Sequence, residues 1–156
     1  MAPRYPVRAL LEFAVYGSDL KALERFYCDV FGLELIMRGG DRLTALRCGH
    51  STLLLFNPEL TREKGQIPEH GADGAGHFAF IIESDERGAW RDHLARHHVA
   101  IEREIEWDEG GASLYVRDPA GNSVELAPPS IWGGLGRSLI DSIDGQPTNR
   151  AIRKTQ

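Results

Sequence analysis

Alternating hydrophobic and polar residues open the sequence. The two alternating sets are Leu11, Phe13 and Val15, and Glu12, Ala14 and Tyr16. This period of two is typical of a strand with one buried face. Ser18 or Asp19 can cap a following helix, whose apolar residues recur at helical spacing until Gly32 ends it. Further strands are predicted between residues 33 and 56, so the first part of the chain is predicted to fold as strand, helix and three strands.

The same order of patterns returns later in the chain. Phe78, Phe80 and Ile82 alternate with other residues from position 77, Ser84 or Asp85 can cap a helix, and strands are predicted between residues 100 and 127. The two copies are separated by residues 58–75, PELTREKGQIPEHGADGA, which lack periodicity and are predicted to form a long loop. Such an internal repeat predicts two units that must pack together, because neither can cover its sheet alone.

The length of the chain indicates one domain. The chain of 156 residues is about one domain in length. We predict a domain at residues 8–128, with its first unit at 8–57, the loop at 58–75 and its second unit at 76–128. Residues 129–156 are predicted to form a C-terminal extension. The fold class is predicted to be α+β, with two tandem βαβββ units.

Composition and charge narrow the function classes. The net charge is -5 and no cluster of Lys and Arg is present, so nucleic acid and anionic membranes are not expected partners. No apolar run approaches the ~20 residues that cross a bilayer, and the N-terminal segment lacks the features of a secretory signal. Cys28 and Cys48 form no metal-binding pattern. We therefore expect a cytoplasmic protein with a small-molecule or protein partner.

Polar residues stand at three positions that are expected to face away from the helices. Successive side chains of a strand point to opposite faces, which leaves Glu12, His77 and Glu125 on the faces opposite the apolar sets. Each residue taken alone has an ordinary interpretation as a solvated or hydrogen-bonded strand residue. Together, two carboxylates and one imidazole suit one divalent ion, which could be Fe, Mn, Ni, Co or Zn. The sequence therefore predicts a metal site if the two sheets curve around a shared cavity.

Several motifs carry a family resemblance. The repeat, together with SDLKALERFYCDVFGLEL, GHFAF and RDPAGNSVEL, resembles the vicinal oxygen chelate superfamily, which includes glyoxalase I, extradiol dioxygenases and bleomycin resistance proteins. The resemblance covers roughly residues 8–128. It implies a cupped, incomplete mixed-sheet barrel of the glyoxalase/dioxygenase type and a homodimer. It also implies that Glu12, His77 and Glu125 are the metal ligands, and Tyr115 lies where extradiol enzymes have a tyrosine beside the metal.

The chain also departs from particular members of that family. Aligning GHSTLLLF with GNSVELAP places Leu53 where glyoxalase I has a fourth ligand, and EIEWDEGGAS lacks a histidine that the extradiol signature contains. The predicted function is a metal-dependent enzyme with isomerase, lyase or dioxygenase chemistry unresolved, acting on a small substrate that chelates the metal through adjacent oxygens. The alternative is a protein that binds and sequesters an antibiotic without catalysis. Tyr115 is the candidate catalytic residue, and His70 marks the long loop as a candidate lid.

Overall fold

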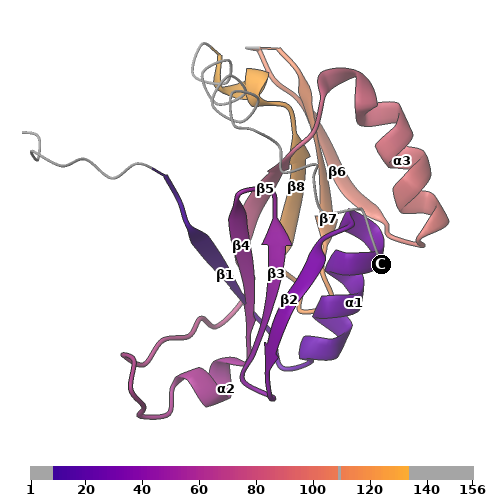
Figure 1. The fold of residues 1–156 in the computed structure, drawn as a ribbon. Helices are drawn as coiled ribbons and strands as arrows, with labels where there is room; N and C mark the ends of the chain where they lie inside the picture. Colours follow the sequence, from indigo (N-terminus) through magenta and orange to yellow (C-terminus); the bar gives the residue numbers. More distant parts are fainter. Residues whose placement is uncertain (1–8, 109, 134–156) are drawn as a thin grey trace, which may run out of the picture. The chain divides into compact units, whose positions relative to one another are not determined.

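The computed structural model describes residues 9–108 and 110–133, and it contains the predicted repeat (Figure 1). The elements of the first repeat are β1 (Glu12–Tyr16), α1 (Leu20–Phe31), β2 (Glu34–Gly39), β3 (Leu43–Cys48) and β4 (Ser51–Phe56). The later elements are α2 (Pro58–Thr61), β5 (His77–Ile81), η1 (Ser84–Glu86), α3 (Arg87–Arg96), β6 (Ile101–Glu106), β7 (Ala112–Arg117), β8 (Ser123–Ala127) and η2 (Pro129–Trp132). The prediction of an α+β fold with two βαβββ units is confirmed.

The first sheet has the strand order β1-β4-β3-β2, with β1 parallel to β4. Helix α1 begins after Asp19, whose side chain accepts a hydrogen bond from the backbone N–H of Ala22, and it ends at Gly32, which adopts the left-handed conformation. The helix packs against β3 and β4, where Leu46, Leu53 and other side chains are fully buried. This apolar layer orients the opposite face of β1, which carries Glu12 and Tyr16, away from α1.

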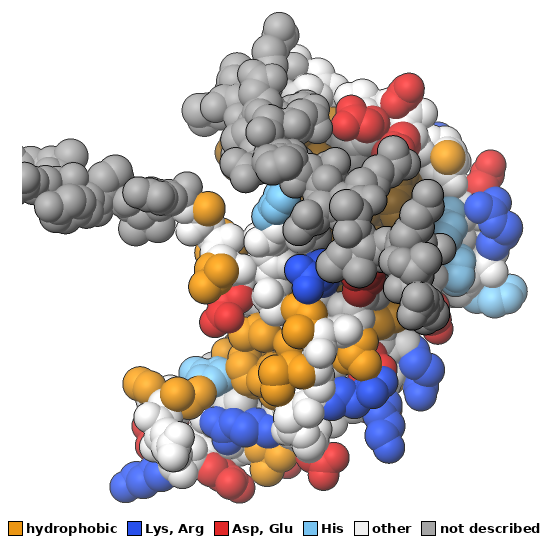
Figure 2. Space-filling model, in the orientation of Figure 1, with side chains coloured by type: hydrophobic (Ala, Val, Ile, Leu, Met, Phe, Trp, Pro, Cys, Tyr) orange, Lys and Arg blue, Asp and Glu red, His pale blue; other side chains and the backbone are white. Residues whose placement is uncertain are grey.

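A bulge changes the direction of side chains along the edge strand β2. The register pairs Leu35 with Leu46 and Met37 with Ala45, so the shift between them moves Met37 to the opposite face from Leu35. Leu35, Met37 and the intervening Ile36 are all partly exposed, and Figure 2 shows hydrophobic side chains gathered over this part of the molecule. The apolar residues of this strand therefore contribute little to the core.

The second sheet has the strand order β5-β8-β7-β6. The N–H of Ser123 donates to the Gly76 carbonyl at 2.8 Å, and the N–H of Ile82 donates to the Ala127 carbonyl at 3.1 Å, which is a parallel arrangement. The helical region differs slightly from the prediction, because the 3-10 turn η1 occupies the expected start and α3 begins only at Arg87. The strand repeat itself is preserved.

The backbone hydrogen bonds correct one alignment between the two repeats. In the first sheet the N–H of Thr52 donates to the carbonyl of Leu11, and Ser123 makes the same bond to Gly76 in the second sheet. Thr52 therefore corresponds to Ser123, and counting onward makes Leu54, not Leu53, the counterpart of Glu125. The alignment of the turns was wrong by one residue because Gly49 precedes Thr52 by three positions, whereas Gly121 precedes Ser123 by two. The conclusion about a fourth ligand is unchanged, since Leu54 cannot coordinate a metal either.

The chain divides into two compact units, and the first of them is discontinuous. It contains the residues up to His77 together with Arg117–Ser123, the turn between β7 and β8. The Asp118 side chain, which is 4% exposed, accepts hydrogen bonds from the Tyr27 hydroxyl at 2.7 Å, from the backbone N–H of Ala120 at 2.9 Å, and from the backbone and side-chain amides of Asn122 at 2.8 Å each. The turn is thereby fixed to α1.

The end of β1 also contacts this turn. The side-chain carbonyl of Asn122 accepts a hydrogen bond from the N–H of Gly76 at 2.8 Å, and its amide donates to the Tyr16 carbonyl at 3.4 Å. Gly17 lies so close to the turn that an added Cβ would be 2.7 Å from the Cβ of Ala120. The register of β8, and with it the direction of Glu125, is therefore set by contacts 46 or more residues apart in the sequence.

The buried hydroxyl of Tyr27 predicts a loss of stability at alkaline pH. Burial raises the pKa of Tyr27 well above its ordinary value, and the charge of Asp118 raises it further. The same hydroxyl ionises near pH 10 in the unfolded chain. Its contribution to stability is therefore complete below that pH and is lost as the pH rises toward the folded pKa, by about 1.4 kcal/mol per pH unit.

Urea unfolding at a series of pH values from about 9 to about 11 would measure this loss. The Tyr27→Phe variant is expected to show a shallower decline, because it has no hydroxyl to ionise in the unfolded state. Equal slopes for the variant and the unchanged protein would contradict the prediction.

The predicted loop at residues 58–75 is more ordered than its composition indicated. It begins with α2, whose first turn is capped by Asn57 through a hydrogen bond from the N–H of Glu59. Proline at the first helical position favours such a start, a signal that the absence of periodicity concealed. Arg62 pairs with Asp73 at 2.6 Å across the rest of the loop.

No helix in the described part of the chain has the length and apolar character needed to cross a membrane. The predicted C-terminal extension at residues 129–156 is described only as far as η2 and Gly133. Its later part, from residue 134, lies outside the described residues.

Candidate metal centre

Two of the predicted ligands, Glu12 and His77, lie in the first compact unit, and each is the first residue of a strand. Glu12 is the first residue of β1, is exposed, and lies beside Thr52 in the parallel register. His77 is the first residue of β5, is also exposed, and its Nδ1 lies 3.2 Å from the Ser123 carbonyl oxygen. The tautomer that donates from Nδ1 to this carbonyl has its lone pair on Nε2. Metal-ligating histidines commonly have this arrangement, so the setting of His77 fits the predicted role.

Glu125 lies in the middle of β8 and is 5% exposed. Its Oε1 accepts a hydrogen bond from the Ser113 hydroxyl, which in turn accepts one from the indole N–H of Trp107 at 2.7 Å. Burying a carboxylate is costly unless polar groups replace its water. The Ser113 hydroxyl provides one such group, and the indole fixes the direction in which this hydroxyl donates.

Tyr115 lies on the same face of β7 as Ser113 and is hydrogen-bonded to Glu125. Its direction, which strand parity in the sequence had left open, is therefore toward the carboxylate. Burial raises the pKa of the Tyr115 hydroxyl, and its hydrogen bond to Glu125 raises it further. At neutral pH the residue is consequently a protonated phenol that can donate a hydrogen bond.

The long loop returns to the face of β1 that carries Glu12. The Tyr16 hydroxyl lies 2.8 Å from Nδ1 of His70, and the rings of both residues contact Phe56. The backbone N–H of His70 also donates to the Thr61 carbonyl at 3.1 Å. Tyr16 and Glu12 share one face of β1 because they are separated by four residues. His70 is thus held at one end of the face that contains a predicted ligand.

The predicted ligands are divided between the two compact units. Within residues 9–108 and 110–133, no three His, Cys, Asp or Glu side chains form a group that could hold a metal ion. Glu12 and His77 belong to one compact unit and Glu125 to the other. The three-ligand site therefore stays a prediction, although two carboxylates and one imidazole are a donor set that fits a divalent ion.

Sequence reasoning missed Ser113 and left open whether Trp107 lines a pocket or fills the core. Ser113 reaches Glu125 from the neighbouring strand β7, and Trp107 reaches Ser113 across the turn between β6 and β7. Neither residue belongs to a recognisable motif. The only signal available was the period of two in β7, which places Ser113 on the same face as Tyr115. That signal becomes useful only when the direction of one of the two side chains is known.

Comparison with known proteins places these features in a family. A model of the family described as Glyoxalase/Bleomycin resistance protein/Dioxygenase superfamily matches residues 9–126. The chain is 29% identical over 123 residues to a catechol-2,3-dioxygenase of Bacillus subtilis, a match that covers 72% of this chain. The chain spans only 41% of the length of that relative.

Solved structures show the same architecture. The crystal structure of a lactoylglutathione lyase from Agrobacterium tumefaciens is 40% identical, with a TM-score of 0.79, and the match covers 83% of this chain and 99% of that protein. An integron cassette protein of V. cholerae is 23% identical, with a TM-score of 0.63 and coverage of 79% and 96% respectively, and it shares the fold alone. These matches confirm the predicted glyoxalase/dioxygenase-like fold.

Proposed function

Because the chain belongs to the Glyoxalase/Bleomycin resistance protein/Dioxygenase superfamily, we propose that it is a metal-dependent enzyme whose small substrate binds the ion through two adjacent oxygens. Glu12, His77 and Glu125 would hold one divalent ion. When bound, such an ion acts as a Lewis acid that stabilises negative charge developing on a substrate oxygen. The observation that carries the proposal is the buried carboxylate of Glu125, which neutral hydrogen-bond donors hold in place.

The side chains around Glu125 would act by orientation and hydrogen bonding. Ser113 and Trp107 hold the carboxylate in one direction, as the hydrogen-bonding partners of metal ligands commonly do. Tyr115, which stays protonated, would donate a hydrogen bond to substrate from the same face. His70 would limit access at the other end of β1, where its contact with Tyr16 fixes the loop.

We infer that the reaction is a proton transfer of the isomerase or lyase kind. A donor set with two carboxylates contains a base that can take a proton from carbon, and Glu12 is the more exposed of the two. The 40% identity with a protein named lactoylglutathione lyase supports this class. Ring cleavage has less support, because the chain lacks the additional histidine of the extradiol signature.

Metal analysis tests the proposal directly. Protein purified without chelator is expected to contain close to one equivalent of Fe, Mn, Ni, Co or Zn, and chelator-treated protein should regain it on titration. Elemental analysis and calorimetry provide the two measurements. A protein that contains no stoichiometric metal and binds none of the five ions would refute the proposed function.

Activity measurements then separate the reaction classes. The metal-loaded protein is expected to form or consume lactoylglutathione, followed by its absorbance, and to leave catechol and oxygen unchanged. Oxygen consumption with catechol would instead assign the dioxygenase class. Tight binding of an antibiotic such as bleomycin, with no turnover and no metal, would favour the sequestering alternative.

The homodimer and the cytoplasmic location also stay proposals, which sedimentation and cell fractionation would test.

A further inference from the structure

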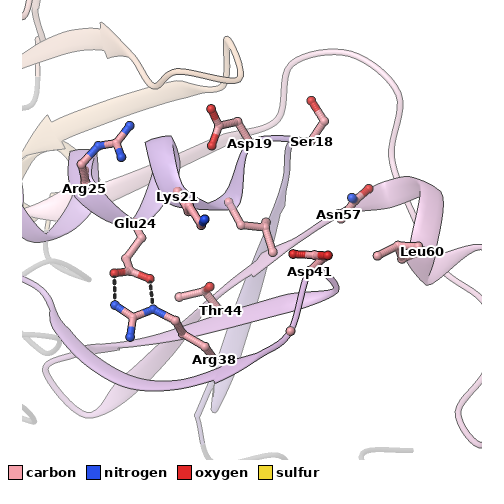
Figure 3. Close-up of a pocket in the computed structure, with 12 residues that line it drawn as sticks. Ser18, Asp19, Lys21, Glu24, Arg25, Arg38, Asp41, Thr44, Asn57 and Leu60 are labelled. Atoms are coloured by element: carbon pink, nitrogen blue, oxygen red, sulfur yellow. Dashed lines mark hydrogen bonds and ion pairs between the residues drawn. The ribbon is translucent and has the colours of Figure 1, made fainter.

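A cavity of about 740 Å³ lies in the first unit, between the start of α1, the turn from β2 to β3, and α2 (Figure 3). It is lined in part by Lys21, Asp41 and Thr44, and by none of the predicted metal ligands. Ligand sites commonly have volumes of roughly 300–1,000 Å³. The cavity is therefore large enough for a small molecule and separate in composition from the proposed metal centre.

Thr44 provides the first indication that the cavity binds something. The residue is 3% exposed and lies on the side of β3 that faces α1, because its partner in the register is the buried Leu55. Its hydroxyl is not among the fully enclosed unpartnered polar atoms of the described residues, so it opens onto the cavity, and in Figure 3 it points from β3 toward α1. A hydroxyl that opens onto a cavity can donate a hydrogen bond to a ligand there and accept one from it.

The charges of the cavity indicate the kind of ligand. Glu24 and Arg38 satisfy each other through paired hydrogen bonds of 2.7 Å and 2.5 Å. Within the described chain, the ammonium of Lys21 and the carboxylate of Asp41 have no ion-pair partner, and both side chains border the cavity. Lys21 and Asp41, both exposed at the opening of the cavity, therefore offer one positive and one negative group to a ligand beside the Thr44 hydroxyl.

The remaining charged side chains of the lining do not change this balance. The Asp19 carboxylate accepts a hydrogen bond from the N–H of Ala22 as the cap of α1, and Figure 3 shows it directed away from Thr44 and Asp41. Figure 3 shows Arg25 directed away from Thr44 and Asp41. A ligand with a single charge would leave either Lys21 or Asp41 unpaired beside it, whereas a zwitterion matches both.

We propose that this cavity binds a small zwitterion of the amino-acid or short-peptide class. Its carboxylate pairs with Lys21, its ammonium pairs with Asp41, and one of its polar atoms forms a hydrogen bond with the Thr44 hydroxyl. This binding does not depend on the proposed metal or reaction, because it uses residues of the first unit alone.

Titration of the full-length protein as purified would test the proposal, with glycylglycine as the probe. Calorimetry and backbone amide NMR shifts should show binding that perturbs residues around Thr44. N-acetylglycylglycine, which lacks the ammonium, and glycylglycine amide, which lacks the carboxylate, are each expected to bind at least ~10-fold more weakly. Equal binding of the three compounds, or no binding of glycylglycine, would overturn the proposal.

Variants with matched controls identify the groups involved. Lys21→Gln and Asp41→Asn are each expected to weaken glycylglycine binding at least ~10-fold, whereas Lys64→Gln and Asp29→Asn, which remove exposed charges elsewhere, should not. Thr44→Val should weaken binding several-fold without lowering the melting temperature, because the hydroxyl has no partner in the described chain. Unchanged affinity in Lys21→Gln and Asp41→Asn, with melting temperatures like that of the unchanged protein, would refute the site.

Discussion

Replacing Glu125 by glutamine is expected to lower the affinity for a divalent metal by more than ~100-fold. Loss of an outer hydrogen-bonding partner of a metal ligand typically costs about 10- to 100-fold, and loss of a ligand should exceed this. Glutamine keeps the size of the side chain and can still accept the hydrogen bond of Ser113, so the fold should be retained. Calorimetric titration of chelator-treated protein with Mn or Zn gives the measurement.

Two further variants separate ligation from general effects. Glu106→Gln removes an exposed carboxylate of the same sheet, one that pairs with Arg87, and should leave metal affinity unchanged. Ser113→Ala is expected to fall between the two, with a loss of about 10- to 100-fold, because it frees the carboxylate without removing it. Metal content in Glu125→Gln equal to that of the unchanged protein would remove Glu125 from the proposed ligand set.

Replacing Asp118 by alanine is expected to lower the free energy of unfolding by about 3–5 kcal/mol. The substitution leaves the Tyr27 hydroxyl and the amides of Ala120 and Asn122 without their acceptor in a buried setting. Hydrogen bonds to charged groups contribute about 1.5–3 kcal/mol each, and unsatisfied buried donors add to the loss. A domain with a total stability of roughly 5–15 kcal/mol would lose a large share of it.

Urea unfolding followed by circular dichroism measures this change. Asp92→Ala on the exposed side of α3 serves as the control, and its stability should change by less than about 0.5 kcal/mol. Tyr27→Phe removes one of the hydrogen bonds and should lie between the two. A loss below about 1 kcal/mol in Asp118→Ala would show that the turn does not depend on this carboxylate.

The strands were largely predictable from the sequence because their patterns are local. The period of two predicted strands at residues 51–56, 112–117 and 123–127, which are the observed bounds of β4, β7 and β8. It placed the start of β3 one residue too early, at position 42, and Gly32 correctly ended α1. The start of α3 and the presence of α2 were not predicted. In both places a short turn or cap decides the backbone, and four or fewer residues give no periodicity to recognise.

The candidate site was predictable only in part, for a different reason. The alternation of side-chain direction along β8 correctly placed Glu125 on the opposite face from Val124 and Leu126. It did not indicate which side chains of the neighbouring strand contact Glu125. Whether Tyr115 approaches Glu125 depends on the pairing of β7 with β8, and the Leu53 error came from assuming equal hairpins. The first question concerns the register of β8, which the turn at Asp118 determines through its contact with α1. The second concerns the place of the glycine within each turn.

The discontinuous first unit has a consequence for synthesis of the chain. Residues up to His77 leave the ribosome well before Arg117–Ser123, yet the compact unit includes both. The hydroxyl of Tyr27 can meet its acceptor only after 91 further residues have been added. Nascent chains that end before this turn would expose the side of α1 that the turn later covers. Folding of the first repeat should therefore be completed only when most of the second repeat has been synthesised.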